Sequence, residues 1–291
     1  MRVSMKYLGL VLCGALLSLT GCADHTTQPE VIPGGQVSAP ERPNMLSVPI
    51  PSGFVRIAGG TGVDVYRKNW SGGQPDFVTV IDLRKARLFN LTGPVSGAPN
   101  GSVTKRTMGE FWQMAVNRNT SSSKAIVVVN GTFFGTDANP TGIAFGLKSM
   151  GQIVHYGYGL HEYPGKTLVL PFDAPRAAAS IQPHARWIFE SGSPDVIGGL
   201  DTSADKGINS LVPRTFIGVR DDDRNGVAET VLLFSSKLAT QPYASSVLTN
   251  FGASRVMMLD GGKTTGLIIS GTAYIQAGRS MPHAIGVAAG R

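Results

Sequence analysis

The segment Met257–Leu267 brings a carboxylate together with glycines and small hydroxyl-bearing residues. The apolar run Val256–Leu259 ends at Asp260, which predicts a buried strand that carries the carboxylate at its end. Glycine lets a ligand approach the backbone, and N–H groups in a tight turn can hold oxygen atoms. The pattern therefore predicts a turn that binds an anion or a sugar, although Asp-Gly pairs are also frequent in plain turns. The residues of this predicted turn are Asp260, Gly261, Gly262, Lys263, Thr264 and Thr265.

The carboxylate of Asp260 could accept sugar hydroxyls, attack as a nucleophile or transfer protons. Lys263 follows closely in the chain, and a neighbouring cation is expected to lower the pKa of a carboxyl. We therefore predict an ionised carboxylate that attacks or orients a substrate. A second carboxylate, where the chemistry needs one, could come from Glu110 or Asp137.

A second segment with the same logic follows the predicted strand Ala125–Val129. Asn130 offers an amide for hydroxyl groups and Gly131 leaves the backbone open. Phe134 could stack on the apolar face of a sugar. The alternative is a turn whose phenylalanines pack in the core.

Two basic segments also precede predicted strands. Arg214 stands before an apolar run, where a guanidinium could hold a phosphate through two hydrogen bonds. Arg279 and His283 precede the last apolar run, where the imidazole could act as an acid, a base or a phosphate donor. The alternatives are a surface arginine and a structural histidine.

Many strands and few helices are predicted, so the fold class is α+β, with a mixed, largely antiparallel sheet and a few packed helices. The helices are Thr107–Val116 and Thr240–Phe251, each opened by a capping threonine. Loops are expected over Pro171–Pro183 and Gly198–Val212. The predicted strands are Val63–Arg67, Phe77–Leu83, Ala125–Val129, Arg186–Phe189, Thr215–Val219, Glu229–Phe234, Arg255–Leu259, Leu267–Ile269, Ala273–Ile275 and Ala284–Ala288.

Residues 1–21 are typical of a bacterial lipoprotein signal peptide. A basic start is followed by the apolar run Tyr7–Leu19, which is too short to span a membrane, and small residues precede Cys22. Cys22 is expected to carry the lipid. We therefore expect a lipid-anchored protein of the bacterial cell envelope, at the outer membrane and facing the periplasm. Residues 22–50, rich in Pro, Thr and Ser, are predicted to be a tether.

The full chain carries a net charge of +7, which suits an anionic ligand or surface. No basic block of the kind that binds nucleic acid occurs, so nucleic acid is not an expected partner. The segment Asp221–Gly226 matches the first half of a calcium loop, but Leu232 stands where a bidentate ligand is needed. We expect a solvated turn there, no metal site and no cofactor.

Taken in order, these segments resemble the phosphodiester glycosidase family, which includes the uncovering enzyme. The segments are VVVNGTFFG with Pro140 and Gly142 after it, RTFIGV, LDGGKTTGL and MPHAIGV, and the likeness runs from about Asp76 to Val287. The resemblance makes residues 51–291 a phosphodiester glycosidase-like domain. Family members usually have Gly-Ser-Ser where this chain has Lys263-Thr264-Thr265, and Asn at the position of His283. The positions that carry over from the motifs are Asn130, Gly131, Arg214, Asp260, Gly261 and Gly262.

The resemblance implies a hydrolase that cuts a sugar–phosphate diester at the anomeric carbon. Asp260 would act at the sugar, and Arg214, with Lys263 or His283, at the phosphate. A phosphate leaves as a stable anion, so one carboxylate plus cations is chemically sufficient. Two alternatives stay open, a non-catalytic lipoprotein that binds a glycan or exopolysaccharide and a phosphodiesterase that cuts the P–O bond.

Overall fold

The computed structural model describes residues 48–173 and 176–291. The predicted signal peptide, the predicted lipidation site Cys22 and nearly all of the predicted tether lie outside these residues. Among the described residues, no helix has both the length and the apolar character needed to cross a membrane.

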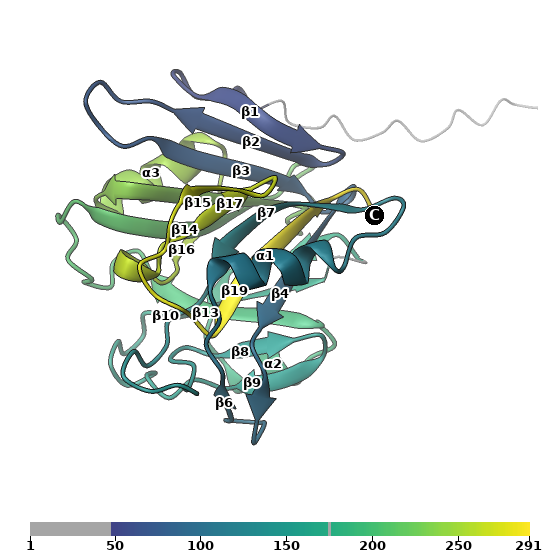
Figure 1. Ribbon diagram of the computed structural model, residues 1–291, viewed down its shortest axis with the longest axis vertical. Coiled ribbons are helices and arrows are strands. Elements are labelled where there is room, and N and C mark those ends of the chain that lie inside the picture. The colour runs from purple at the N-terminus through teal and green to yellow at the C-terminus, as the bar shows by residue number, and fades with distance from the viewer. Residues whose placement is uncertain (1–47, 174–175) are drawn as a thin grey trace, which may run out of the picture. The chain divides into compact units, whose positions relative to one another are not determined.

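Two β-sheets form the body of the domain, and the predicted α+β class is confirmed (Figure 1). Neighbouring strands run antiparallel in both sheets. The large sheet has the strand order β1 (Val55–Gly60), β2 (Val63–Lys68), β3 (Asp76–Asp82), β15 (Thr230–Ala239), β14 (Val212–Arg220), β16 (Arg255–Met258), β13 (Asp195–Asp201), β10 (Thr167–Asp173) and β11 (Ala178–Ala179), with β8 (Leu147–Ser149), β9 (Gln152–His155) and β12 (Gln182–Pro183) attached. The small sheet has the order β18 (Thr272–Ile275), β17 (Leu267–Ile269), β7 (Lys124–Asn130), β19 (His283–Ala289) and β4 (Ala86–Thr92), and β5 (Val95–Ser96) pairs with β6 (Ser102–Val103).

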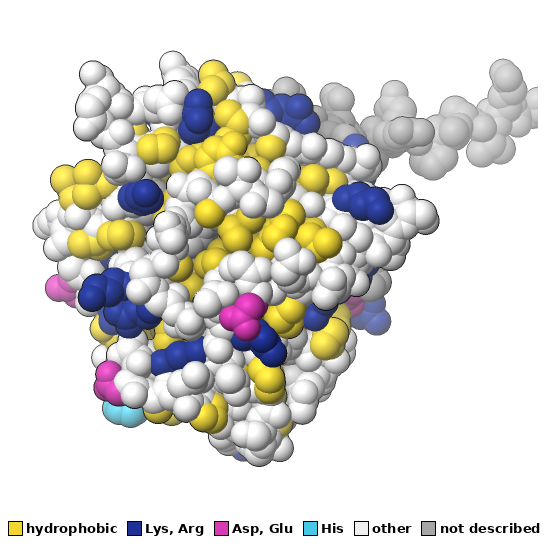
Figure 2. Space-filling model, in the orientation of Figure 1, with side chains coloured by type: hydrophobic (Ala, Val, Ile, Leu, Met, Phe, Trp, Pro, Cys, Tyr) yellow, Lys and Arg dark blue, Asp and Glu magenta, His cyan; other side chains and the backbone are white. Residues whose placement is uncertain are grey.

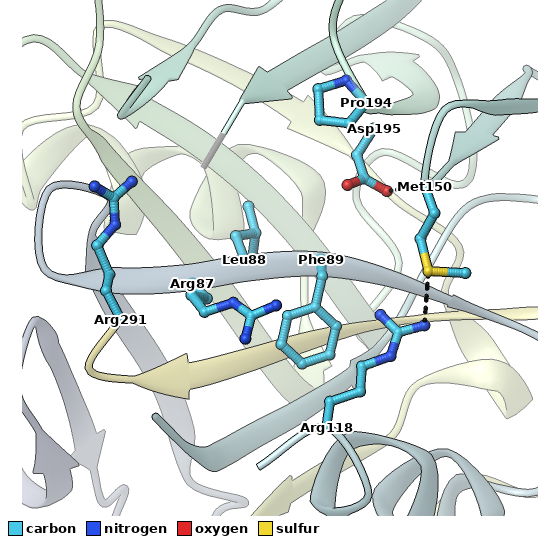
Figure 3. Close-up of a pocket in the computed structure, with 8 residues that line it drawn as sticks. All are labelled: Arg87, Leu88, Phe89, Arg118, Met150, Pro194, Asp195 and Arg291. Carbon is cyan, nitrogen blue, oxygen red and sulfur yellow. Dashed lines mark hydrogen bonds between the residues drawn. The ribbon is translucent and has the colours of Figure 1, made fainter. Parts of the chain in front are cut away.

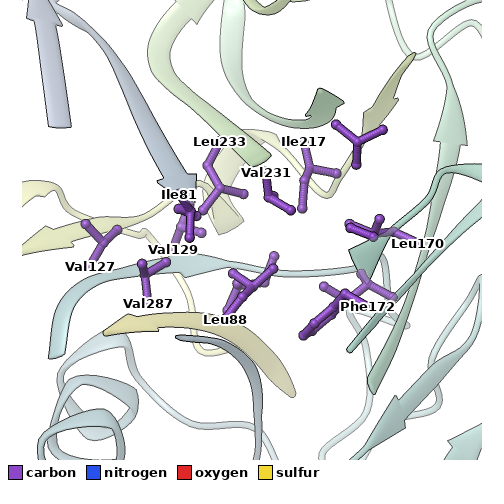
Figure 4. Close-up of a cluster of buried hydrophobic side chains, with 14 of the residues drawn as sticks. Ile81, Leu88, Val127, Val129, Leu170, Phe172, Ile217, Val231, Leu233 and Val287 are labelled. Atoms are coloured by element: carbon purple, nitrogen blue, oxygen red, sulfur yellow. The ribbon is translucent and has the colours of Figure 1, made fainter. Parts of the chain in front are cut away.

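The largest hydrophobic core lies between the two sheets (Figure 4). Along β7, Val127 and Val129 point into this core, whereas Val128 points to the opposite side, as the alternation of side chains along a strand requires. Other side chains of this core are Leu88 and Val287 from the small sheet and Ile81, Leu170, Phe172, Ile217, Val231 and Leu233 from the large sheet.

Two helices cover the outer faces of the sheets. Helix α1 (Met108–Val116) packs on the small sheet, where its Phe111 joins Val128 in a second core. Helix α3 (Gln241–Asn250) packs on the large sheet through Leu248. Each helix has the predicted threonine cap, with a complete capping box at α1, so both predicted helices are confirmed. The layers therefore run α3, large sheet, small sheet, α1.

Three sequence predictions of local structure were wrong. Arg186–Glu190 forms the short helix α2 and not a strand. The predicted loop Pro171–Pro183 contains the end of β10 and both β11 and β12. The predicted loop from Gly198 begins as strand β13, although glycine disfavours strands. At Gly198 the close approach of another backbone explains the residue, because an added Cβ would lie 1.8 Å from the carbonyl oxygen of Phe145.

The packing at Gly198 gives a test of the fold. Gly198→Ala should lower the free energy of unfolding by about 2–3 kcal/mol or more, since the backbone of Phe145 cannot move without disturbing the sheet. Gly192→Ala is the matched control, because an added Cβ there meets nothing within 4 Å. Urea unfolding of both variants measures the difference, and equal stabilities would contradict the packing described here.

Candidate active site

Asp260 lies in the loop that leads from β16 of the large sheet to β17 of the small sheet. Its backbone N–H donates to the carbonyl of Gly131 at 3.1 Å, and Gly131 directly follows β7. The N–H of Gly261 donates to the Asp260 carboxylate at 2.8 Å. Ends of strands from both sheets therefore meet at this carboxylate.

The environment of Asp260 favours its protonated form. Burial raises the pKa of Asp260 to about 6. The Thr264 side chain, the Gly261 N–H and the charges of Arg279 and Lys206 each lower the pKa without overcoming the effect of burial. Asp260 as a whole residue remains partly exposed. A carboxyl with a pKa near 6 is suited to chemistry near neutral pH.

The predicted effect of Lys263 on this carboxyl was wrong. Lys263 is exposed on the single 3₁₀ turn η1 (Gly262–Thr264), and it is not among the groups that shift the pKa of Asp260. Gly262 has a φ of +61°, which favours glycine. Thr265 is buried, and its hydroxyl has no hydrogen-bond partner among the described residues.

Asn130 holds the Asp260 loop in place. Its amide nitrogen donates to the backbone carbonyl of Asp260 at 2.7 Å. Its amide oxygen accepts from the Thr215 hydroxyl at 2.6 Å and from the Gly266 N–H at 3.2 Å. The side chain is fully buried, so its geometry suits a positioning role and not the predicted contact with sugar hydroxyls.

His283 is buried beneath the same loop and is neutral. Its Nδ1 accepts from the Thr132 N–H at 3.1 Å, so the proton is on Nε2, which lies 2.9 Å from the amide oxygen of Asn90. Burial lowers the pKa of His283 to about 3. A Cβ added to Gly131 would lie 1.9 Å from His283 Nδ1. The structure therefore does not support the phosphate-binding role predicted for His283, because both ring nitrogens are occupied.

The Arg214 side chain is also buried, and its hydrogen bonds are made inside the protein. It is 4% exposed, and its guanidinium donates to the carbonyls of Ala239 at 3.3 Å, Lys206 at 3.0 Å and Gly207 at 2.6 Å. The geometry does not support the predicted phosphate clamp. Arg214 instead anchors the loop that carries Lys206.

Lys206 is a cation of the site that the sequence reading missed. Its ammonium lies 5.5 Å from the ring centroid of Phe133 and 5.4 Å from that of Tyr163, distances at which a cation is attracted to an aromatic face. Its charge lowers the pKa of Asp260, so it acts on the carboxyl electrostatically. Lys206 belongs to no motif and lies in a polar stretch predicted to be a loop. Its positive charge was the only feature of the sequence that could have indicated a role in the site.

Arg279 and Lys105 extend the positive charge. Arg279 was predicted, and its charge lowers the pKa of both Asp260 and Lys105. Lys105 was missed; its ammonium donates to a backbone carbonyl and lies 5.1 Å from the ring centroid of Phe134. Phe134 is buried, so its ring packs in the core and is not free to stack on a sugar. Tyr158, also missed, is 43% exposed, and burial together with nearby carboxylates, Asp260 among them, raises its pKa.

The two candidates for a second carboxylate lie in different settings. Glu110 accepts from the N–H and hydroxyl of Thr107 and pairs with Arg106, so it serves the cap of α1. Asp137 is exposed, and its charge reaches Tyr158 and Lys105. Of the two, Asp137 is the one placed near the charged groups of the site.

The calcium-like segment lies in the hairpin between β14 and β15. The carboxylates of Asp221, Asp223 and Glu229 approach to within 4.8 Å of one another. Their oxygens accept from N–H groups of Asn225 and Gly226 and, at Glu229, from the N–H of Asp222. Asp260 lies beside the opposite end of β14, because the N–H of Leu259 donates to the carbonyl of Thr215.

Residues 109–288 match the phosphodiester glycosidase family, and the chain belongs to that family. None of the curated proteins matches it. The fold is similar to the catalytic domain of zebrafish N-acetylglucosamine-1-phosphodiester alpha-N-acetylglucosaminidase, which is auto-inhibited by its pro-peptide, with a TM-score of 0.52 and 13% identity over 80% of each chain. A hypothetical protein from Synechocystis is similar with a TM-score of 0.45 and 14% identity, over 78% of this chain and 62% of that one. This chain therefore spans less than two thirds of the Synechocystis protein.

The neutral state of His283 predicts a pH effect on stability. In the unfolded chain a histidine gains a proton below about pH 6.5, whereas folded His283 stays neutral down to its pKa of about 3. The parent therefore loses stability as the pH falls from about 6.5. The variant His283→Asn lacks this loss. Its free energy of unfolding relative to the parent should therefore rise by up to about 1.4 kcal/mol for each unit by which the pH falls between about 6.5 and 3. Urea unfolding at several pH values measures this, and a difference that is independent of pH would contradict a neutral imidazole.

Proposed function

We propose that the protein hydrolyses the glycosidic bond of a sugar-1-phosphodiester, with Asp260 at the sugar. One observation carries the proposal: a partly exposed carboxylate lies in electrostatic reach of two cations, Lys206 and Arg279, in a member of the phosphodiester glycosidase family. A carboxylate can act at an anomeric carbon, and cations stabilise a phosphate that leaves with the bonding electron pair.

The division of roles follows from which side chains are free. Lys206 is exposed and Arg279 is partly exposed, so both can receive a phosphate. Arg214 and Asn130 make their hydrogen bonds inside the protein and fix the Lys206 loop and the Asp260 loop. The phosphate role predicted for Arg214 thus passes, in this proposal, to Lys206 and Arg279.

The surroundings of the site suit a glycan larger than one sugar. A hollow of about 650 Å³ adjoins Arg279 between α1 and the β17–β18 hairpin. Trp112, Gln113 and Gln276 line it, and such aromatic and amide groups bind sugar rings and hydroxyls. Basic side chains predominate over acidic ones on the face shown in Figure 2. These features support a phosphate-bearing glycan or exopolysaccharide as the substrate class.

We also propose that the protein works at the bacterial envelope. The support is in the sequence, where an apolar run and small residues precede Cys22 in the manner of a lipoprotein signal. Lipidation of Cys22 would hold the domain at the outer membrane, facing the periplasm, through the predicted tether 22–50.

Asp260→Asn tests the catalytic role of the carboxylate. We expect release of sugar from a UDP-sugar or another sugar-1-phosphodiester to fall by about 10²–10⁴-fold. For the parent, kcat/KM should rise with pH through about 6, because the ionised carboxylate is the reactive form. Initial rates between pH 4 and 8, an experimental range of about two units either side of that pKa, measure both. A rate that falls through pH 6 would show that the protonated acid is the active form.

The same variant carries its own folding control. The raised pKa of Asp260 means that its ionisation, which develops as the pH rises from about 4 to 6, destabilises the folded protein. Asp260→Asn should therefore be more stable than the parent at pH 7, by about 1–3 kcal/mol. Activity lost together with stability would leave the carboxylate without a demonstrated role. Binding of phosphoglycans without any turnover by the parent would favour the non-catalytic binding protein, and ¹⁸O from water found in the phosphate product would favour a phosphodiesterase.

A second test distinguishes the roles of Lys206 and Arg279 from that of Lys263. Lys206→Gln or Arg279→Gln should lower kcat/KM for a sugar-1-phosphodiester by about 10–100-fold, the worth of one charged hydrogen bond. Lys263→Gln is the matched control and should stay within about twofold, because Lys263 is exposed and is not among the charges that shift the pKa of Asp260. A neutral nitrophenyl glycoside should lose less activity than the phosphodiester in both cation variants. The reverse order, with Lys263 dominant, would contradict the assignment.

A further inference from the structure

A second basic hollow lies at the other end of the small sheet from Asp260 (Figure 3). Arg87, the second residue of β4, pairs with Ala288, which pairs with Ala125 near the start of β7, whereas Asn130 ends β7 beside the Asp260 loop. The hollow has a volume of about 510 Å³. Its lining comprises Arg87, Leu88, Phe89, Arg118, Met150, Pro194, Asp195 and Arg291.

Two guanidinium groups in this hollow lie against one aromatic ring. Their central carbons are 5.0 Å (Arg118) and 5.9 Å (Arg87) from the ring centroid of Phe89, as Figure 3 shows for the side chains flanking it. Burial lowers the pKa of Arg118 most; the charge of Asp195 raises it, and the charge of Arg87 lowers it, which records repulsion between the two guanidinium groups. The ring attracts both guanidinium groups, and an anion bound between them would relieve their mutual repulsion.

The protein itself supplies little to balance these charges. Among the described residues, neither Arg87 nor Arg118 forms an ion pair within 4.0 Å. Arg118 donates to the carbonyl of Asn90 at 3.2 Å and weakly to the sulfur of Met150 at 3.6 Å, and the Arg87 side chain forms no hydrogen bond with a described residue. Asp195 is the one acidic residue in the lining, and its carboxylate accepts from the Met150 N–H at 3.3 Å. Three arginine side chains thus line the hollow with one aspartate, so positively charged side chains predominate there.

We propose that this hollow binds the phosphomonoester group of a phosphorylated saccharide. A phosphomonoester carries close to two negative charges at neutral pH, which suits a lining rich in arginine, and its oxygens suit the forked N–H groups of arginine. The volume exceeds what one phosphate needs and lies in the range of small-molecule sites. Phe89 and Pro194 offer apolar surface to the organic part. Phosphomonoesters are also what cleavage at Asp260 would release, a link that rests on the proposed function, although binding here does not require that reaction.

Calorimetric titration of the full chain with glucose 6-phosphate tests the proposal. The titration uses the background Lys206→Gln/Arg279→Gln, so that phosphate binding at the Asp260 site is weakened and the hollow is read separately. In this background we expect saturable binding of glucose 6-phosphate. Adding Arg87→Gln and Arg118→Gln should weaken it by at least tenfold, the loss expected from one charged hydrogen bond. Arg186→Gln is the matched control, because Arg186 is exposed and pairs with Glu190 on α2, and it should leave the affinity unchanged.

Arg87→Gln alone guards against a folding defect, because the Arg87 side chain forms no hydrogen bond that the fold needs. It should weaken binding several-fold at an unchanged melting temperature. Unchanged affinity in this variant and in the double variant would overturn the site. Equal affinity for neutral glucose would overturn the phosphate assignment, and equal affinity for inorganic phosphate would overturn the saccharide assignment. Since the readout is binding, an inactive enzyme that still binds glucose 6-phosphate would refute the proposed function and leave this inference standing.

Discussion

The side chain of Asn130 is the contact on which the arrangement of the site depends. Asn130 is the last residue of β7 in the small sheet. Its side-chain amide accepts a hydrogen bond from Thr215 on β14 of the large sheet and donates to the backbone of Asp260. One buried amide thus ties two sheets and the connecting loop together, with no water in between. A buried amide that loses its partners costs about 1–3 kcal/mol, so each of the three segments is held to the others. Asp260, two residues beyond the end of β16, is held in position by this junction.

The site concentrates groups that water would otherwise stabilise. Asp260 is buried enough to raise its pKa, Arg214 is enclosed by carbonyls, and His283 is kept neutral. Each of these buried groups opposes folding unless hydrogen bonds compensate for the lost water. Arg214 and His283 have such partners, whereas the Asp260 carboxyl is compensated by the Gly261 N–H, the Thr264 side chain and the charges of Arg279 and Lys206. Of these three residues, Asp260 is the one that is partly exposed.

The sequence was a sound guide to elements whose signals are local. The two capped helices, α1 and α3, formed as predicted, because the residues that cap a helix lie within a few positions of one another in the sequence. The sequence-based prediction failed at β13, where Gly198 makes room for the backbone of Phe145, which is distant in the chain. It also failed at Arg186–Glu190, because the apolar pattern of so short a segment does not distinguish a helix from a strand. At the candidate site, the motifs predicted loops but did not show which way the Arg214 and His283 side chains point. Lys206 could not be found from its neighbours in the chain, because its place beside Asp260 is set by the anchoring of its loop.

That anchoring is made almost wholly through main-chain atoms. Arg214 holds the loop by the carbonyls of Lys206 and Gly207, and every amino acid carries the same carbonyl. The side chains of the loop are therefore free to differ while its path is kept. Substitutions there change the groups that the loop presents without rebuilding the scaffold, so the loop is a place where sequence change is tolerated.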